Sequence, residues 1–214
     1  MLLMKRAVLW DFGGVILSSP FEAFRRYEAE RDLPIDFIRG VNTTNPHGNA
    51  WALLERGEVT VAEFDDLFAA ESAALGHRVA GADVLSLLAG DVRPEMVALL
   101  DRVKDAGYLV ACLTNNVVGG DGAFDSGAAR AVEIAAIMDR FDVIVESSKV
   151  GVRKPESRFY EIACELLDVR PVECVFLDDL GINLKPAAAM GMTTIKVTTP
   201  AQAIADLGAS LGWT

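Results

Sequence analysis

The second half of this chain alternates between helical and extended apolar segments, and this alternation constrains the fold more than any other feature. After Pro94, four predicted helices are each followed by a short apolar strand. The helices are expected over residues 94–106, 127–139, 156–167 and 183–190. The strands are expected over residues 108–113, 142–145, 174–177 and 193–197. Strands that alternate with helices in this way pair in parallel through right-handed crossovers.

A further apolar strand is expected near the start of the chain, over residues 6–10. It ends abruptly at Asp11, and Gly13 and Gly14 follow, which suits a tight turn at the carboxyl end of a buried strand. The five strands together predict an α/β fold with a doubly wound, five-stranded, parallel Rossmann-like core.

Residues 18–91 have helical spacing throughout and no predicted strand. Thr60 and Glu63 form a capping box at the start of one of these helices. We therefore predict an all-helical cap over residues 18–91, inserted after the first strand, and an α/β catalytic core over residues 1–17 and 92–214. An insertion at this point stands over the carboxyl ends of the strands, where a lid excludes water from a site. A purely structural helical bundle is the alternative.

Composition limits the classes of partner. The 214 residues are 51% hydrophobic with a net charge of −11, which allows a sizeable core but opposes binding to nucleic acid. No apolar run approaches the ~20 residues of a membrane span, and the first six residues do not have the order of a signal peptide. The apolar surroundings of Cys112, Cys164 and Cys174 predict buried thiols. We expect a cytoplasmic protein with a small-molecule substrate; the oligomeric state is left open.

Polar side chains follow four of the predicted strands. They are Asp11, then Thr114 and Asn115, then Lys154 in the loop after the third cluster, and finally Asp178 and Asp179 with Asn183. The carboxyl ends of parallel strands meet at one edge of a sheet, so we expect these side chains to converge. Each cluster alone is common, because Thr-Asn turns and carboxylates at helix starts are ordinary loop chemistry.

Taken together, the clusters supply the groups that phosphoryl transfer needs. Asp11 and Asp179 offer the hard oxygen ligands that Mg²⁺ prefers. Thr114 offers a hydroxyl group, Asn115 an amide and Lys154 a cation. These groups suit a phosphoryl group held for in-line attack by a carboxylate, a reaction that depends on positioning and charge neutralisation.

The four clusters resemble the four motifs of the haloacid dehalogenase-like superfamily, over nearly the whole chain. Residues 113–115, 150–156 and 176–187 resemble one branch in particular. That branch includes the N-terminal phosphatase domain of soluble epoxide hydrolases and the N-terminal domain of some acyl-CoA dehydrogenase family proteins.

The resemblance implies a nucleophile and a metal site. Asp11 would form an aspartyl-phosphate. Mg²⁺ would be bound by Asp11, by the backbone carbonyl of Gly13 and by Asp179. Asp178 would lie nearby, and Asn183 would brace the metal end of the site. The helical insertion would be the cap that the family places after its first motif.

The resemblance also implies a phosphate-binding set. Thr114 and Lys154 would hold the phosphoryl oxygens, and Asn115 would help to orient the group. The Gly-rich residues 117–122 are expected to be a loop rather than a second phosphate cradle, because no lysine follows at the spacing of a P-loop.

Gly13 departs from the pattern of phosphatases in this superfamily, which carry an aspartate at that position. That aspartate protonates the leaving alcohol and then activates water, and such help is worth about 10²–10⁴-fold in rate. His47, Glu55 and Glu58 in the cap are candidates to replace it, although His47 also fits a solvated loop. Glu58 also fits a residue that only precedes the Thr60 capping box.

Three functions are therefore open at this point. The favoured one is a Mg²⁺-dependent phosphatase-type hydrolase of a small phosphorylated metabolite. A metal-independent dehalogenase-type hydrolase is disfavoured, because a site without metal would leave the charges of Asp178 and Asp179 uncompensated. The third is a catalytically weak or inactive binding protein that keeps the shape of the site.

Overall fold

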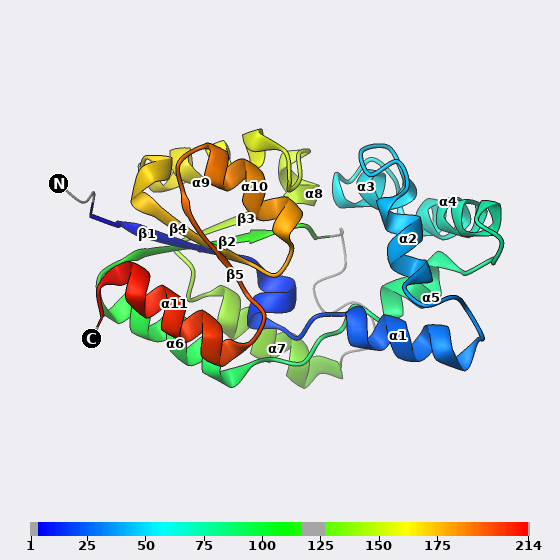
Figure 1. Ribbon diagram of the computed structural model, residues 1–214, viewed down its shortest axis with the longest axis horizontal. Helices are drawn as coiled ribbons and strands as arrows, with labels where there is room; N and C mark the ends of the chain where they lie inside the picture. The colour runs from blue at the N-terminus through cyan, green and yellow to red at the C-terminus, as the bar shows by residue number, and fades with distance from the viewer. Residues whose placement is uncertain (1–3, 117–126, 214) are drawn as a thin grey trace.

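The computed structural model describes residues 4–116 and 127–213 (Figure 1). The Gly-rich residues 117–122 lie outside the described residues. One parallel sheet of five strands forms in the order β3-β2-β1-β4-β5. The strands are β1 (Ala7–Trp10), β2 (Leu109–Thr114), β3 (Val143–Glu146), β4 (Cys174–Asp178) and β5 (Thr193–Lys196). The doubly wound Rossmann-like core is confirmed, and the ends of its strands differ from the prediction by at most one residue.

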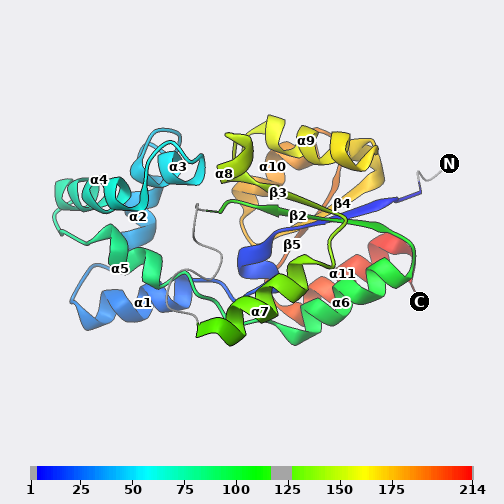
Figure 2. The same cartoon turned by 180° about the vertical axis from the view of Figure 1, so that it is seen from behind.

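Helices cover both faces of this sheet (Figures 1 and 2). One face carries α6 (Pro94–Asp105), α7 (Gly127–Met138) and α11 (Pro200–Leu211). The other carries α9 (Ser157–Leu167) and α10 (Gly181–Ala189), with the short α8 (Ser147–Val150) following β3. The central strands β1, β2 and β4 are almost wholly buried because both faces are covered, and this explains their continuous apolar runs, whereas the edge strands β3 and β5 are partly exposed.

β1 lies at the centre of the sheet, between β2 and β4. Its residues pair in register with both neighbours, so that Trp10 is level with Cys112 and Leu177. Asp11 therefore emerges in the middle of the carboxyl edge. The strand order reverses beside β1, which is the place where open α/β sheets bind their ligands.

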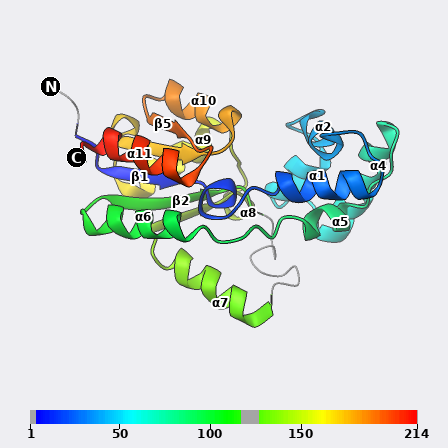
Figure 3. The ribbon, with the colours of Figure 1, turned by 60° about the horizontal axis from the view of Figure 1, so that its bottom comes forward.

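A separate helical module follows β1, and it consists of α1 to α5 (Figure 3). The helices are α1 (Phe21–Glu30), α2 (Phe37–Thr43), α3 (Ala50–Glu55), α4 (Val61–Ala74) and α5 (Gly81–Ser86). They enclose an apolar cluster of their own around Phe64 and Phe68. The chain leaves and re-enters the sheet domain beside a bridge between Leu17 and Val92. The exact domain bounds stay a prediction.

Three α-helices, α2, α8 and α11, are not among the predicted elements. α2 is short and lies inside the region that was read only as helical. α11 packs against α6 and β5 at the end of the chain. The capping box of Thr60 and Glu63 at the start of α4 is confirmed, as is the burial of all three cysteines. Among the described residues, no helix is both long enough and apolar enough to cross a membrane.

Candidate active site

The first part of the site is the turn after β1. The backbone N–H of Asp11 donates to Leu177 O at 2.9 Å, which ties the turn to β4. Its side chain caps the turn, because Oδ1 accepts a hydrogen bond from the backbone N–H of Phe12 at 2.7 Å. Asp11 is only 7% exposed. The abrupt end of the apolar run thus fixes a carboxylate in a buried position at the centre of the sheet edge.

The two glycines of this turn have different roles. Gly14 has a φ of 78°, and a Cβ there would lie 2.7 Å from Oδ1 of Asp179 and closer still to its Cγ. Glycine is therefore needed for Asp179 to approach the turn. Gly13 has ordinary extended angles (φ −70°, ψ 133°), and a Cβ there would meet no atom of the described residues within 4 Å. Open space stands where a second carboxylate would project.

A buried lysine joins two of the strand ends. Lys154 is 1% exposed, and its Nζ lies 2.8 Å from Oδ1 of Asp11 and 2.9 Å from Oδ2 of Asp178. Burial alone would lower the pKa of Lys154, but Asp11 and Asp178 more than offset this and raise it. The lysine is therefore charged at neutral pH and holds the two carboxylates together.

Asp178 is fully buried and anchored from several directions. Its Oδ1 accepts from the backbone N–H of Leu180 at 2.7 Å, and both carboxylate oxygens accept from Nδ2 of Asn183 at 3.0–3.1 Å. Asn183 is held in turn by Tyr160, whose hydroxyl donates to its carbonyl oxygen at 2.6 Å. Asp178 and Asn183 thus position Lys154, and Asp179 is the member of the pair that is left partly exposed.

Asp11, Asp178 and Asp179 form one acidic cluster, in which an oxygen of each lies within 4.8 Å of the others. Burial raises the pKa of Asp11, the charges of Asp178 and Asp179 act in the same direction, and Lys154 opposes them. Burial and Asp178 likewise raise the pKa of Asp179, to about 6. Three ionised carboxylates against one ammonium group would leave two negative charges uncompensated. This donor set, oxygens with a net negative charge, fits a divalent hard cation.

The end of β2 supplies the next residues. Cys112 is level with Trp10, so Thr114 extends to the level of the turn beyond Asp11 and is buried there. Asn115 clamps the backbone of Lys154: its Nδ2 donates to Lys154 O at 3.0 Å, and its Oδ1 accepts from Lys154 N at 2.8 Å. The strand ends predicted to converge are therefore brought together.

The helical module also contacts this edge, through Glu55 at the end of α3. An oxygen of Glu55 lies 2.5 Å from Nη2 of Arg153 and 3.3 Å from Nδ2 of Asn115. The other oxygen accepts from Nε1 of Trp51 at 3.0 Å. Arg153 also donates to Pro46 O at 3.1 Å, so it contacts the module twice. Burial raises the pKa of Glu55, and Arg153 opposes the shift.

The other two candidates to replace the missing aspartate at position 13 are both exposed. His47 is exposed, and its carbonyl oxygen accepts a hydrogen bond from Arg56. Glu58 is exposed and forms an ion pair with Arg56 at 2.6 Å. Sequence reasoning missed Arg153 and Tyr160. Arg153 adjoins Lys154 and could have been noticed, whereas Tyr160 falls within the apolar spacing of α9 and is typical of a core position.

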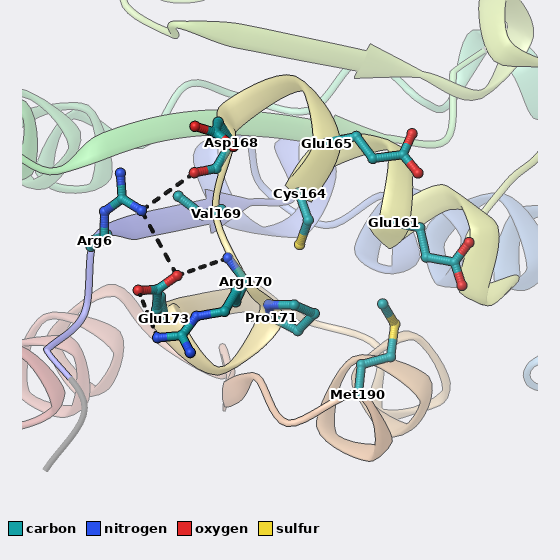
Figure 4. A pocket seen from close by; sticks show the side chains of 10 residues that line it. All are labelled: Arg6, Glu161, Cys164, Glu165, Asp168, Val169, Arg170, Pro171, Glu173 and Met190. Atoms are coloured by element: carbon teal, nitrogen blue, oxygen red, sulfur yellow. Dashed lines mark hydrogen bonds and ion pairs between the residues drawn. The ribbon is translucent and has the colours of Figure 1, made fainter. Parts of the chain in front are cut away.

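A separate pocket of about 520 Å³ lies away from these residues (Figure 4). Arg6 and Glu173 line it, and they precede β1 and β4, so the pocket is at the opposite, amino-terminal edge of the sheet. Within it, Arg6 and Arg170 both form ion pairs with Glu173. Arg6 donates to Asp168 O at 3.3 Å, and Arg170 pairs with Glu173 at 3.1 Å (Figure 4). The convergent acidic cluster, not this pocket, is the candidate active site.

The sequence matches the haloacid dehalogenase-like hydrolase family over residues 5–191. The chain therefore belongs to that family, as the four strand-end clusters indicated, and it is a hydrolase of this type.

Two mouse proteins illustrate the relationship. Acyl-CoA dehydrogenase family member 10 from Mus musculus is 32% identical over 215 residues, which cover 97% of this chain and 19% of the relative. Bifunctional epoxide hydrolase 2 from the same organism is 33% identical over 214 residues, which cover 94% of this chain and 38% of the relative. The chain thus spans well under half the length of either relative.

Solved structures share the fold. A family enzyme from Bacteroides thetaiotaomicron, crystallised with magnesium and inorganic phosphate, has a TM-score of 0.59 at 21% identity and covers 89% of this chain and 93% of its own. The L-2-haloacid dehalogenase of Xanthobacter autotrophicus, with chloropropionic acid covalently bound, has a TM-score of 0.62 at 19% identity. The match covers 97% of this chain and 83% of the dehalogenase chain. The chain therefore shares its fold with both of these structures.

Proposed function

We propose that this protein is a Mg²⁺-dependent phosphoric monoester hydrolase that acts on a small phosphorylated metabolite through an aspartyl-phosphate at Asp11. The observation that carries the proposal is the charge of the acidic cluster. Among the described residues, three clustered carboxylates are accompanied by one ammonium group, that of Lys154, which contacts Asp11 and Asp178. A divalent cation would compensate the remaining two negative charges.

Asp11, Asp179 and the backbone carbonyl of Gly13 would hold the metal. The close approach of Asp179 to Gly14 supports this assignment, because it brings a second carboxylate beside the Asp11 turn. When bound, Mg²⁺ would neutralise the charge of a phosphoryl group and so allow it to approach the carboxylates.

The chain's own residues would carry out the displacement. Asp11, held by Lys154 and by the N–H of Phe12, is fixed as the attacking carboxylate. Lys154 and the Thr114 hydroxyl would bind phosphoryl oxygens, and Asn115 keeps the lysine backbone in place. Asp178 would hold the lysine charge at that point without itself reacting. Such prior positioning is the main source of rate enhancement in phosphoryl transfer.

The helical module would act as a cap over this site. Its contacts through Arg153 to Pro46 and Glu55 support the proposal, because they join the module to the loop that carries Lys154. The identity of the substrate would then depend on the residues that the module presents. Closure would exclude water and strengthen each charge interaction beneath it.

The test is phosphate release from p-nitrophenyl phosphate. We expect release that requires Mg²⁺, falls to background with EDTA and is abolished by Asp11→Asn. Equal, background-level release from the wild type and Asp11→Asn across a panel of phosphate monoesters would refute the proposal. The dehalogenase alternative is tested in parallel with fluoroacetate, and metal-independent release of fluoride would favour it.

A further inference from the structure

The catalytic chemistry proposed above needs a proton at the leaving oxygen, and position 13 has no side chain to supply it. In an in-line displacement the leaving oxygen lies on the side of phosphorus opposite to Asp11. Asp11 directly follows β1 at the carboxyl edge of the sheet, and this edge faces the helical module (Figure 1). A group that replaces the missing carboxylate must therefore come from the module or from the open space beside Gly13.

Glu55 is the titratable side chain through which the module meets this edge. It is 7% exposed, and it contacts Asn115, the residue directly after the predicted phosphate ligand Thr114. Asn115 is bonded twice to the backbone of Lys154, whose Nζ contacts Asp11. Two residues thus link Glu55 to the nucleophile: Asn115, and Lys154, whose backbone is held by Asn115 and whose ammonium group contacts Asp11.

The surroundings of Glu55 differ from those of an ordinary surface ion pair. Trp51, Asn115 and Arg153 each donate to its carboxylate, and the charges of Lys154 and Arg56 also act on it. Exposed Glu58, on the same turn, has only Arg56 as a charged partner in the described residues. Burial raises the pKa of Glu55 and so favours its protonated form, against the effect of Arg153.

We propose, on the basis of the proposed phosphatase function, that Glu55 performs the proton transfers that an aspartate at position 13 would perform. Asp11 attacks phosphorus, the P–O bond to the alcohol breaks, and protonated Glu55 donates its proton to the leaving oxygen. Glu55, now ionised, takes a proton from the water that attacks the phosphorus of phosphorylated Asp11. Inorganic phosphate and free Asp11 result, and Glu55 is protonated again, so that the cycle closes.

The experiment compares two substrates that differ in the leaving group. Phenyl phosphate releases a poor leaving group that needs a proton, whereas p-nitrophenyl phosphate releases a good one that does not. Glu55→Gln is expected to lower kcat/KM for phenyl phosphate by about 10²–10⁴-fold and for p-nitrophenyl phosphate by less than about tenfold. The ratio of the two values is measured on one sample, so it does not depend on the fraction of the variant that is folded.

Three further variants separate proton transfer from a structural role. Glu58→Gln, on the same turn, should leave the ratio at the wild-type value. Arg153→Met removes the ion pair but keeps the carboxylate, and it should lower kcat/KM equally for both substrates. Adding Gly13→Asp to Glu55→Gln should restore most of the loss with phenyl phosphate, because the space beside Gly13 can hold the new carboxylate.

Two results would overturn the inference while the phosphatase proposal stands. One is an equal loss for both substrates in Glu55→Gln. The other is a changed ratio in Arg153→Met that matches the one in Glu55→Gln, which would show that Glu55 acts only as the partner of Arg153. Failure of the wild type to release phosphate with Mg²⁺ is a different result, and it would overturn the proposed function and this inference together.

Discussion

The adjacent glycines of the Asp11 turn allow a matched test of the site geometry. Gly14→Ala places a Cβ 2.7 Å from Oδ1 of Asp179 and closer still to its Cγ and Oδ2, whereas ordinary contact begins at 3.4 Å, so the carboxylate must retreat by more than about 0.7 Å. A φ of 78° adds about 1–2 kcal/mol for a residue with a side chain, and an off-rotamer carboxylate adds about 0.5–1.5 kcal/mol. We therefore expect a loss of about 2–3 kcal/mol in the free energy of unfolding.

Gly13→Ala is the control, because its backbone angles suit any residue and its Cβ would meet open space in the described structure. Its free energy of unfolding should change by less than about 1 kcal/mol. Equilibrium urea unfolding measures both values, and calorimetric titration with Mg²⁺ should show at least about tenfold weaker binding in Gly14→Ala only. Equal stability of the two variants, with equal Mg²⁺ affinity, would refute the assigned role of Gly14.

Three more perturbations test the supporting contacts. Lys154→Met leaves the carboxylates of Asp11 and Asp178 without their buried partner. It should lower the free energy of unfolding, measured in urea, by about 3–5 kcal/mol. A loss below about 1 kcal/mol would argue against the buried ion pairs. Tyr160→Phe removes the hydrogen bond to Asn183 O and should cost about 1–3 kcal/mol in the same assay, whereas an unchanged midpoint would show that this bond contributes nothing. Hydrogen bonds from Arg170 lower the pKa of Glu173 to about 2. Ionised Glu173 therefore stabilises the fold fully at pH values above the pKa that this side chain has in the unfolded chain, and the stabilisation is lost as the pH falls through about 2. Thermal unfolding should therefore show Glu173→Gln less stable than the wild type at pH 7, with the difference disappearing near pH 2.

The sheet and the ends of its strands could be predicted because their signals are local. The central strands β1, β2 and β4 are apolar runs that are buried on both faces, and each run stops at a polar residue such as Asp11 or Asp178. Parallel pairing then brings those ends together, whatever the details of the helices. The sequence therefore predicts that Asp11, Asp178 and Asp179 lie together at this edge.

The helix α11 was missed although its local signals are present. Thr199 caps it by accepting a hydrogen bond from the backbone N–H of Gln202, Pro200 occupies its first turn, and Gly212 ends it in the left-handed conformation. This order of residues is the expected signature of a helix start and end. The local sequence therefore contains the start and end signals of α11.

The contact between Glu55 and Arg153 could not be predicted in the same way. It depends on how the helical module sits on the sheet domain, and no periodicity within either segment encodes that placement. The sequence marked Glu55 only as one of three candidates, together with His47 and Glu58. Tertiary structure distinguishes them, because Glu55 is buried against Asn115 while the other two are exposed.

Covalent labelling of Asp11 tests the central claim most directly. The protein is mixed with p-nitrophenyl phosphate and Mg²⁺, quenched in acid during turnover, digested, and its peptides are weighed by mass spectrometry. The account predicts one added phosphoryl group on the peptide that contains Asp11, absent without Mg²⁺ and absent in Asp11→Asn. Turnover of the ester with the phosphoryl group on another residue, or undiminished turnover in Asp11→Asn, would contradict it.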